Sequence, residues 1–410
     1  MNTILRRVLC CPIILLSMVF MISCSKEKRI EISVTNPNDF SISDAFVSVE
    51  IDTALNSFSL FNGKDEIPYQ ILFLNEKKEI GFVMNLNPSE TKVLTLETDT
   101  GNQVHQIKSR TYAELAMKST NVYIDGKFRG DEFKNVTKIK VPKIHTDHDA
   151  LFKYEGPGWE SEKVGYRFYL DWRNANDIFG KKVNALVLEN VGTHDTVATD
   201  DSYHSMLDWG MDIFKVGNSL GIGSIGMWYD GKVNMVSQTD SVYFEIPYNG
   251  PFISEIKTSY FGWRVGNNKY DLVTSISITA GSRLSNCKIN ISKDAENIVT
   301  GLVKSEGTNF IAKKDGEEWA YIALYGTQTL VDSEDKLGIA VFYRQSDLIE
   351  LSEDSLNHII KLKPDHGKVE YSFCAAWEQE PDGITNEEDF IKYLDRTLAL
   401  LNNPIVVKLN

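Results

Sequence analysis

Short stretches that alternate apolar and polar residues run along most of this 410-residue chain, with Asn, Gly and Pro between them. Such alternation is typical of β-strands with one buried face, and the connections are turns rather than crossover helices. The pattern predicts a small β-sandwich over residues 31–105. Over residues 106–410 the strands are longer, and a large antiparallel structure of two packed sheets fits them best.

Two segments show a helical pattern instead. One is TYAELAMKS, residues 111–119, which follows a polar linker. The other closes the chain at residues 385–403, where Thr385 is the expected N-cap and Pro404 follows the last turn. The predicted fold class is therefore mainly β: a small sandwich, a large antiparallel β-structure and a short C-terminal helix.

The first 24 residues have the order of a secretory signal. Arg6 and Arg7 precede an apolar run that ends at Ser23 and Cys24. A small residue before cysteine at this point is typical of a bacterial lipobox, so we expect Cys24 to become a lipidated N-terminus, followed by a tether over residues 25–30. A transmembrane anchor is the alternative, but the run is short for a span. The expected location is the outer membrane, on its periplasmic or cell-surface face.

Charge and cysteine content narrow the function classes. The net charge of −14 argues against nucleic acid, which requires clustered cations. Beyond the signal and Cys24, only Cys287 and Cys374 remain, too few for a disulfide framework or a metal cluster. We predict buried free thiols, with a single bridge between them as the alternative, and no cofactor. A metal ion is left open, because His145 and His148 lie among aspartates in a weak ligand pattern.

One charged strand carries the clearest candidate site. In YRFYLDWR, alternate residues fall on opposite faces. The apolar face would hold Tyr166, Phe168, Leu170 and Trp172, and the other Arg167, Tyr169, Asp171 and Arg173. The second face is either a solvated row of ion pairs or a binding surface. The choice of arginine twice beside tyrosine favours binding, since the guanidinium fork grips carboxylates.

Further candidates flank this strand in sequence. A glycine turn upstream precedes Trp159 and carries acids, and a later loop places Tyr203 beside His204, the best proton-transfer candidate. Exposed Trp and Tyr rings stack on sugar rings while polar neighbours bind hydroxyls. The residues expected to contact substrate are Trp159, Glu160, Glu162, Asp171, Asp208, Trp209, Lys215 and Trp263.

Three stretches together resemble a family of bacterial lipoproteins classified as a domain of unknown function: residues 155–182, residues 202–223 and residues 375–394. The resemblance covers nearly all of the mature chain. It implies an origin in polysaccharide-utilisation clusters of Bacteroidota and a galactose-mutarotase-like supersandwich. Some relatives resemble oligosaccharide dehydratases that act on a terminal glucuronate, so the implied partners are acidic oligosaccharides, the membrane through the lipid, and other glycan-degrading enzymes.

Dehydration across C4 and C5 of a uronate requires three chemical roles, which the candidate residues can fill. A cation must hold the carboxylate, a base must take the C5 proton and an acid must protonate the departing 4-hydroxyl. The expected catalytic residues are Tyr166, Arg167, Arg173, Tyr203 and His204. By parity Tyr166 lies opposite Arg167, so both could act only if a bulge redirected one of them.

Two alternatives stay open. A glycoside hydrolase would use paired carboxylates, for which the candidates are Glu160, Glu162, Asp171 and Asp208. A glycan-binding lipoprotein would use the same aromatic residues and show no turnover.

Overall fold

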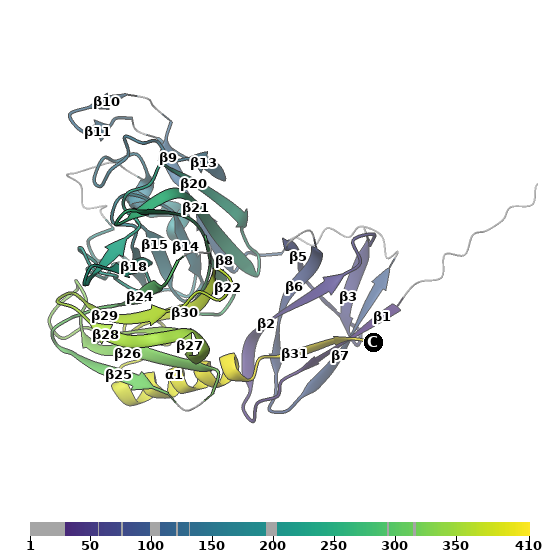
Figure 1. Cartoon of the computed structure of the whole chain (residues 1–410). Coiled ribbons are helices and arrows are strands. Elements are labelled where there is room, and N and C mark those ends of the chain that lie inside the picture. The colour runs from purple at the N-terminus through teal and green to yellow at the C-terminus, as the bar shows by residue number, and fades with distance from the viewer. Residues whose placement is uncertain are drawn as a thin grey trace, which may run out of the picture.

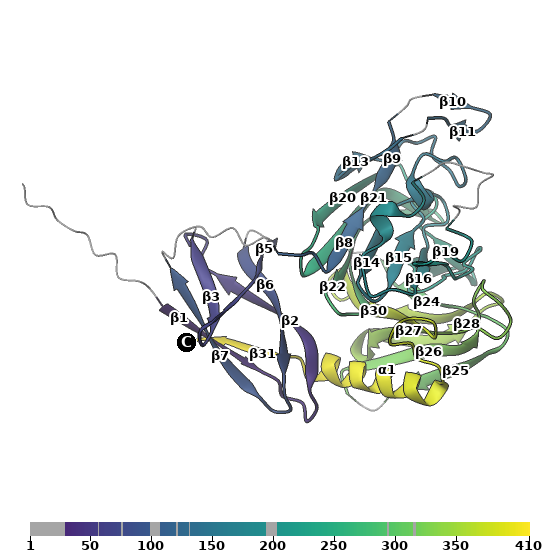
Figure 2. The same ribbon diagram turned by 180° about the vertical axis from the view of Figure 1, so that it is seen from behind.

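The computed structural model describes residues 29–55, 57–74, 77–98, 107–119, 122–130, 132–193, 203–292, 295–314 and 317–410. Almost all regular elements in these ranges are β-strands, arranged in a small N-terminal domain and a larger second domain (Figures 1 and 2). The predicted fold class is confirmed. The expected signal and Cys24 lie outside the described residues.

The small domain is a sandwich of two antiparallel sheets. The first sheet runs in the order β31 (Val406–Leu409), β1 (Arg29–Thr35), β7 (Thr91–Thr98), β3 (Phe58–Asn62) and β4 (Asp65–Ile67). The second contains β2 (Ile42–Ile51), β6 (Lys77–Leu86) and β5 (Gln70–Leu74). Alternate side chains such as Ile32, Phe82 and Leu94 are fully buried between the sheets, as the alternation predicts.

One strand of this small domain comes from the far end of the chain. After the C-terminal helix the chain returns to the small sandwich, where β31 pairs antiparallel with β1 (Figure 2). Val407 packs against the small core. The sequence pattern did not predict this return, so the small domain contains more than residues 31–105.

The large domain is built on a nine-stranded antiparallel sheet. Its order is β13 (Lys138–Lys140), β20 (Ser241–Tyr248), β21 (Ile253–Val265), β22 (Asn268–Thr279), β23 (Leu284–Ile291), β30 (Lys368–Trp377), β27 (Lys336–Arg344), β26 (Trp319–Thr327) and β25 (Thr308–Lys313).

Two five-stranded sheets form the second layer. One runs β17 (Gly210–Asp212), β16 (Asn176–Lys181), β15 (Gly165–Phe168), β14 (Gly158–Ser161) and β8 (Thr111–Glu114). The other runs β19 (Lys232–Met235), β18 (Gly226–Tyr229), β24 (Ile298–Val303), β29 (Asn357–Leu362) and β28 (Leu348–Glu353). One continuous apolar core fills the space between the layers, with the Tyr166 and Phe373 rings in edge contact across it.

Smaller elements complete the large domain. Two ribbons pair β9 (Ala116–Lys118) with β12 (Phe133–Asn135), and β10 (Tyr123–Ile124) with β11 (Lys127–Phe128). Three short 3₁₀ turns are η1 (Lys153–Glu155), η2 (Leu188–Asn190) and η3 (Gln345–Asp347). The predicted helix at residues 111–119 is wrong: these residues form β8 and β9, because sheet pairing outweighs their local helix propensity.

The C-terminal helix α1 (Glu387–Asn402) packs on the outside of β26 and β27. Its apolar residues Phe390 and Leu394 are fully buried, and a side chain at Gly338 would collide with the Phe390 ring. The helix was predicted, but its N-cap is Asn386 rather than Thr385, since the Asn386 side chain accepts a hydrogen bond from the amide of Asp389.

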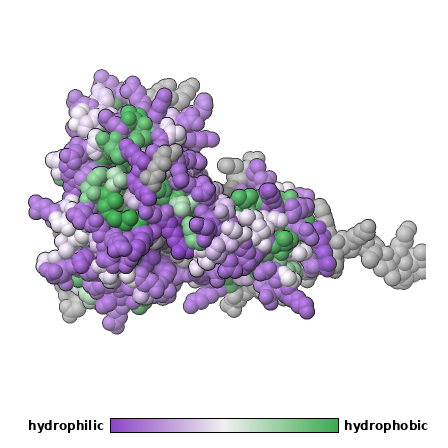
Figure 3. All heavy atoms as spheres, turned by 90° about the horizontal axis from the view of Figure 1, so that it is seen from below, coloured by the Kyte–Doolittle hydropathy of each residue, from purple (hydrophilic) through white to green (hydrophobic). Residues whose placement is uncertain are grey.

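Hydrophilic residues cover most of the face seen from below, with separate hydrophobic patches among them (Figure 3). Within the described ranges, no helix has the length and apolar character needed to cross a bilayer.

Candidate functional site

The charged side chains of β15 and its neighbours lie on the sheet face that points away from the apolar core. In the register, Arg167 on β15 is opposite Asp177 on β16, and Asp212 on β17 is opposite Phe179 on β16. Tyr166 and Phe168 point the other way, into the core. The predicted division of the two faces is therefore correct for β15 itself, which ends at Phe168.

Arg167 lies in the middle of this face and is almost fully buried. Its Nη2 atom is 2.8 Å from Oδ2 of Asp177 and 2.5 Å from Oδ2 of Asp212. Its Nη1 atom is 3.4 Å from the hydroxyl of Tyr203 and 3.8 Å from Oε2 of Glu155. Burial opposes its charge, but these carboxylates raise the pKa of Arg167 well above its usual range, so it remains a cation.

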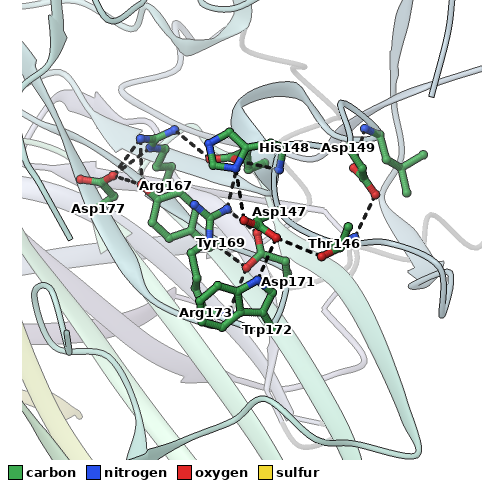
Figure 4. Close-up of polar contacts among 12 residues, drawn as sticks. Thr146, Asp147, His148, Asp149, Arg167, Tyr169, Asp171, Trp172, Arg173 and Asp177 are labelled. Carbon is green, nitrogen blue, oxygen red and sulfur yellow. Dashed lines mark hydrogen bonds and ion pairs between the residues drawn. The ribbon is translucent and has the colours of Figure 1, made fainter. Parts of the chain in front are cut away.

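Tyr169 lies between two arginines (Figure 4). The guanidinium of Arg173 lies 3.8 Å from the centre of its ring and that of Arg167 lies 4.8 Å away, while its hydroxyl donates to Asp177. Burial, together with the charge of Asp212, raises the pKa of Asp177 to about 7 even though Arg167 opposes the shift. The sheet thus holds a buried carboxyl group able to carry a proton near neutral pH.

Glu155 connects the two arginines. Its Oε1 is 3.0 Å from Nη2 of Arg173, which also pairs with Asp171. Burial alone would raise the pKa of Glu155, but Arg167 and Arg173 outweigh this effect and lower it. We call the following nine residues the charged centre: Glu155, Arg167, Tyr169, Asp171, Arg173, Asp177, Tyr203, His204 and Asp212.

Backbone strain gathers around the charged centre. Ten non-glycine residues in the described ranges have a positive φ; one of them is Glu155 of the charged centre, and four more are close in sequence to Glu155 or Arg173. These are His148 (58°), Ala150 (59°), Tyr154 (40°), Glu155 (70°) and Asn174 (48°). Such conformations cost free energy and persist where the surrounding structure imposes them, which is frequent at functional sites.

The exposed edge of the charged centre is formed by Tyr203 and His204. The Nδ1 atom of His204 is 3.2 Å from Oδ2 of Asp212, and its ring lies 4.3 Å from that of Tyr203. A backbone hydrogen bond of 2.8 Å from Asp212 to the carbonyl of Tyr203 fixes this pair against β17. His204 is mostly exposed, whereas burial raises the pKa of Tyr203 although Arg167 opposes it. The pair offers a histidine oriented by a buried carboxylate beside a protonated phenol.

On the other side of Glu155 lie two residues of the 147–148 turn. His148 donates its backbone amide to Glu155 and is highly exposed, with Nδ1 3.6 Å from Oε1 of Glu155. Asp147 accepts a hydrogen bond of 2.8 Å from the indole of Trp172. The expectation that Trp172 lies on the core face is wrong: the strand ends before it, and its side chain is 45% exposed.

Trp172 lines two hollows. One, of about 470 Å³, is lined by His145, Asp171, Gln238, Asp240 and Arg264 among others. The second, of about 330 Å³, is lined by Arg173, Asn218, Lys232, Asn234 and Gln238 among others. Trp172, Ser237 and Gln238 line both, so we refer to the pair as the Trp172 groove. Its size and its mixture of one exposed indole with amides and hydroxyls suit a small polar ligand.

Four predicted site residues lie elsewhere, which corrects their assignment. Tyr166 is in the core, where its hydroxyl donates to the carbonyl of Arg283 and accepts from the amide of Ala375. Trp159 and Trp263 are fully buried, so their rings offer no face to a sugar. Glu160 is a buried partner of Lys181 at 2.7 Å. Alternation identified these residues as strand positions but did not show which layer covers them.

The remaining predicted residues have varied positions. Glu162 pairs with Arg110, which also contacts Asp44 at 2.6 Å, so it helps to join the two domains. Trp209 packs edge-on against Phe179 beneath Tyr203. Asp208 and Lys215 are exposed near β17.

Sequence reasoning missed several members of the site. Glu155, Asp177 and Asp212 were visible as acids close to the charged strand, but the register that brings them to Arg167 was not. His148 was considered only as a metal ligand. Among described residues, no group of three or more His, Cys, Asp or Glu could hold a metal ion. Cys287 and Cys374 are buried free thiols, as predicted.

Residues 34–407 match a family described as a domain of unknown function, DUF4861. A search of curated proteins finds no match. Among solved structures, the chain is similar to a protein in glycosyl hydrolase family 38 from Enterococcus faecalis, with 8% identity and a TM-score of 0.44 over 93% of this chain and 47% of the other. An alpha-mannosidase from Enterococcus faecalis V583 gives 8% identity and a TM-score of 0.46, over 93% and 46% of the two chains. The chain thus spans about half the length of these proteins.

Proposed function

The chain belongs to the DUF4861 family, a domain of unknown function, and from its charged centre we propose that it is a lipid-anchored enzyme that removes water from acidic oligosaccharides. The observation that carries this proposal is the contact between His204 and Asp212 beside Tyr203. An elimination needs a base and an acid close together, and this pair supplies both at the surface of a buried ionic network.

The proposed reaction acts on a terminal uronate. Nδ1 of His204 lies 3.2 Å from Oδ2 of Asp212, and the imidazole held by this carboxylate takes the C5 proton of the sugar. The C4–O bond then breaks, the hydroxyl takes the phenolic proton of Tyr203 and leaves as water, and a double bond forms between C4 and C5. After turnover, solvent takes the proton from His204 and supplies one to the Tyr203 phenolate, which restores both groups.

Arg167 has a different role from the one expected from the sequence. Two carboxylates and two phenols already occupy its guanidinium, so it orients Asp212 and Tyr203 rather than binding the substrate carboxylate. The smaller hollow of the Trp172 groove is the better anion site. Among the described residues, Lys232 lines it and no carboxylate does, while its other cation, Arg173, already pairs with Asp171 and Glu155, so Lys232 is the expected partner of the substrate carboxylate.

The location and partners follow from the same proposal. Lipid on Cys24 would hold the enzyme at the outer membrane, close to the enzymes that shorten the polysaccharide. Its product, a 4,5-unsaturated uronate, would pass to a hydrolase specific for that group. The net charge of −14 is compatible with a small anionic ligand because cations, and among the described residues no carboxylate, line the smaller hollow of the Trp172 groove.

The test is ultraviolet absorbance of the conjugated double bond, with mass spectrometry, on glucuronate-terminated oligosaccharides. We expect loss of one water without chain cleavage. His204→Gln and Tyr203→Phe should each lower turnover by roughly 100-fold or more. His366→Asn, a change at an exposed histidine outside the centre, should not alter it.

Each other outcome has a distinct meaning. New reducing ends without absorbance would identify a glycoside hydrolase, and absorbance with two shorter fragments would identify a polysaccharide lyase. Binding without any turnover would identify a glycan-binding protein, for which the exposed indole of Trp172 supplies the independent observation.

A further inference from the structure

A third hollow adjoins the Trp172 groove. It has a volume of about 400 Å³ and lies over β20 and β21, lined by Lys138, Tyr243, Glu245, Ser259 and Phe261 among others. Ser241, the first residue of β20, lines both this hollow and the larger hollow of the Trp172 groove. The third hollow therefore meets the larger hollow of the Trp172 groove at Ser241.

Two exposed aromatic rings line this third hollow. Tyr243 is 37% exposed and Phe261 is 43% exposed, and their rings meet edge to face at 5.7 Å. Lys140 lies 5.4 Å from the centre of the Tyr243 ring, and Lys138 pairs with Glu245 at 3.1 Å. Charged groups thus surround a small aromatic surface that the protein leaves in contact with solvent.

We propose that the Trp172 groove continues over β20 to a remote subsite formed by Tyr243 and Phe261, so that the ligand is a chain of several sugar units. This inference rests on the proposed function and deepens it, since it assigns the length of the substrate. Sugar rings present apolar faces to aromatic side chains and hydroxyls to polar ones, and the hollow offers both around Ser241 and Ser259.

Register within the sheet supports the subsite. Tyr243 is opposite Ser259, and Phe261 is opposite Ser241, so the two aromatic rings are diagonal neighbours on one face and the two serines complete the square. A cross-strand pair that served only the sheet would stabilise it slightly and bind nothing. The dependence of affinity on ligand length distinguishes a binding role of the two aromatic residues from a purely structural one.

The experiment is calorimetric titration of the full chain with a disaccharide and with longer members of one uronate-terminated series. The double variant Tyr243→Ala with Phe261→Ala should bind longer members roughly tenfold more weakly and leave the disaccharide unaffected. Trp172→Ala should weaken both. Phe73→Ala, at an exposed aromatic of the small domain, is the matched control and should change neither.

The outcomes keep the two proposals apart. If wild-type protein dehydrates the oligosaccharides but the double variant binds every length normally, the remote subsite is wrong and the proposed function stands. If wild-type protein neither binds nor dehydrates any member, the proposed function fails and the subsite fails with it. Equal weakening for all lengths, with a lowered melting temperature, would show that the aromatic pair only supports the sheet.

Discussion

Arg167 on β15 reaches past the intervening strand β16 to Asp212 on β17, with 2.5 Å between Nη2 and Oδ2. The same nitrogen also contacts Asp177 on β16, directly across the register. One guanidinium therefore ties three strands together on the polar face of the sheet. Because Asp212 also contacts His204, this ionic network sets the position of the proposed base.

Replacement of Arg167 should be strongly destabilising. Arg167→Met keeps much of the side-chain volume but leaves Asp177 and Asp212 buried without their cation, which costs about 3–5 kcal/mol in comparable sites. Urea unfolding of wild type and variant measures the difference. Arg29→Ala, which removes an exposed pair with Glu97, is the control and should cost no more than about 1 kcal/mol. A similar small loss for both variants would contradict the central role of Arg167.

The raised pKa of Asp177 predicts how stability depends on pH. The unfolded carboxyl has a pKa of 3.8 and the folded one a pKa of about 7, so between these values the folded state binds more protons. The contribution of Asp177 to the free energy of unfolding is therefore complete at low pH. It is lost as the pH rises from about 4 to about 7, by at most ~1.4 kcal/mol per pH unit. Chemical denaturation across this range, compared with Asp177→Asn, isolates the effect.

The side-chain amide of the Asp177→Asn variant cannot titrate, so the difference in unfolding free energy between the two proteins should change with pH in that window. This amide also keeps an oxygen that can accept from Arg167 and Tyr169, which limits other disturbance. Parallel curves for wild type and variant would mean that Asp177 is ionised throughout.

The fold was largely predictable because its signal is local. Alternation of apolar and polar residues identified strands such as β21 and β22, where every second side chain is buried along most of each strand. The same rule failed at residues 111–119, whose short apolar spacing also fits a helix turn. It also failed to detect that β31 returns to β1, since pairing between the two ends of a chain leaves no local pattern.

The site was predictable only in part, because strand register, like pairing between the two ends of the chain, leaves no local pattern in the sequence. Arg167, Tyr203 and His204 could be selected by residue type, and the structure brings them together. Which of the acids would join them depended on strand register. Trp159 and Trp263 share the residue type of Trp172, yet of these three only Trp172 lies outside the core, because the strand ends before it.

Trp172 should contribute to ligand binding and little to stability. Its ring is 45% exposed and its indole donates to Asp147, so Trp172→Ala should weaken oligosaccharide binding roughly tenfold while the melting temperature stays nearly constant. Calorimetry and thermal unfolding on the same samples check both parts. Phe73→Ala, at an exposed ring on β5 of the small domain, is a suitable control for affinity. Loss of stability without loss of affinity would show that Trp172 mainly anchors the 147–148 turn.

The C-terminal strand should be required for the small domain to be stable. β31 covers the edge of β1 through four residue pairs, and Val407 packs against the small core. Deletion after Asn403 would expose the hydrogen-bonding groups of β1, which then have only β7 as a neighbour among the described strands. Hydrogen exchange should therefore accelerate in β1 and β7 and stay unchanged in the nine-stranded sheet. If protection in β1 were the same in the truncated chain, the small sandwich would be stable without its C-terminal strand.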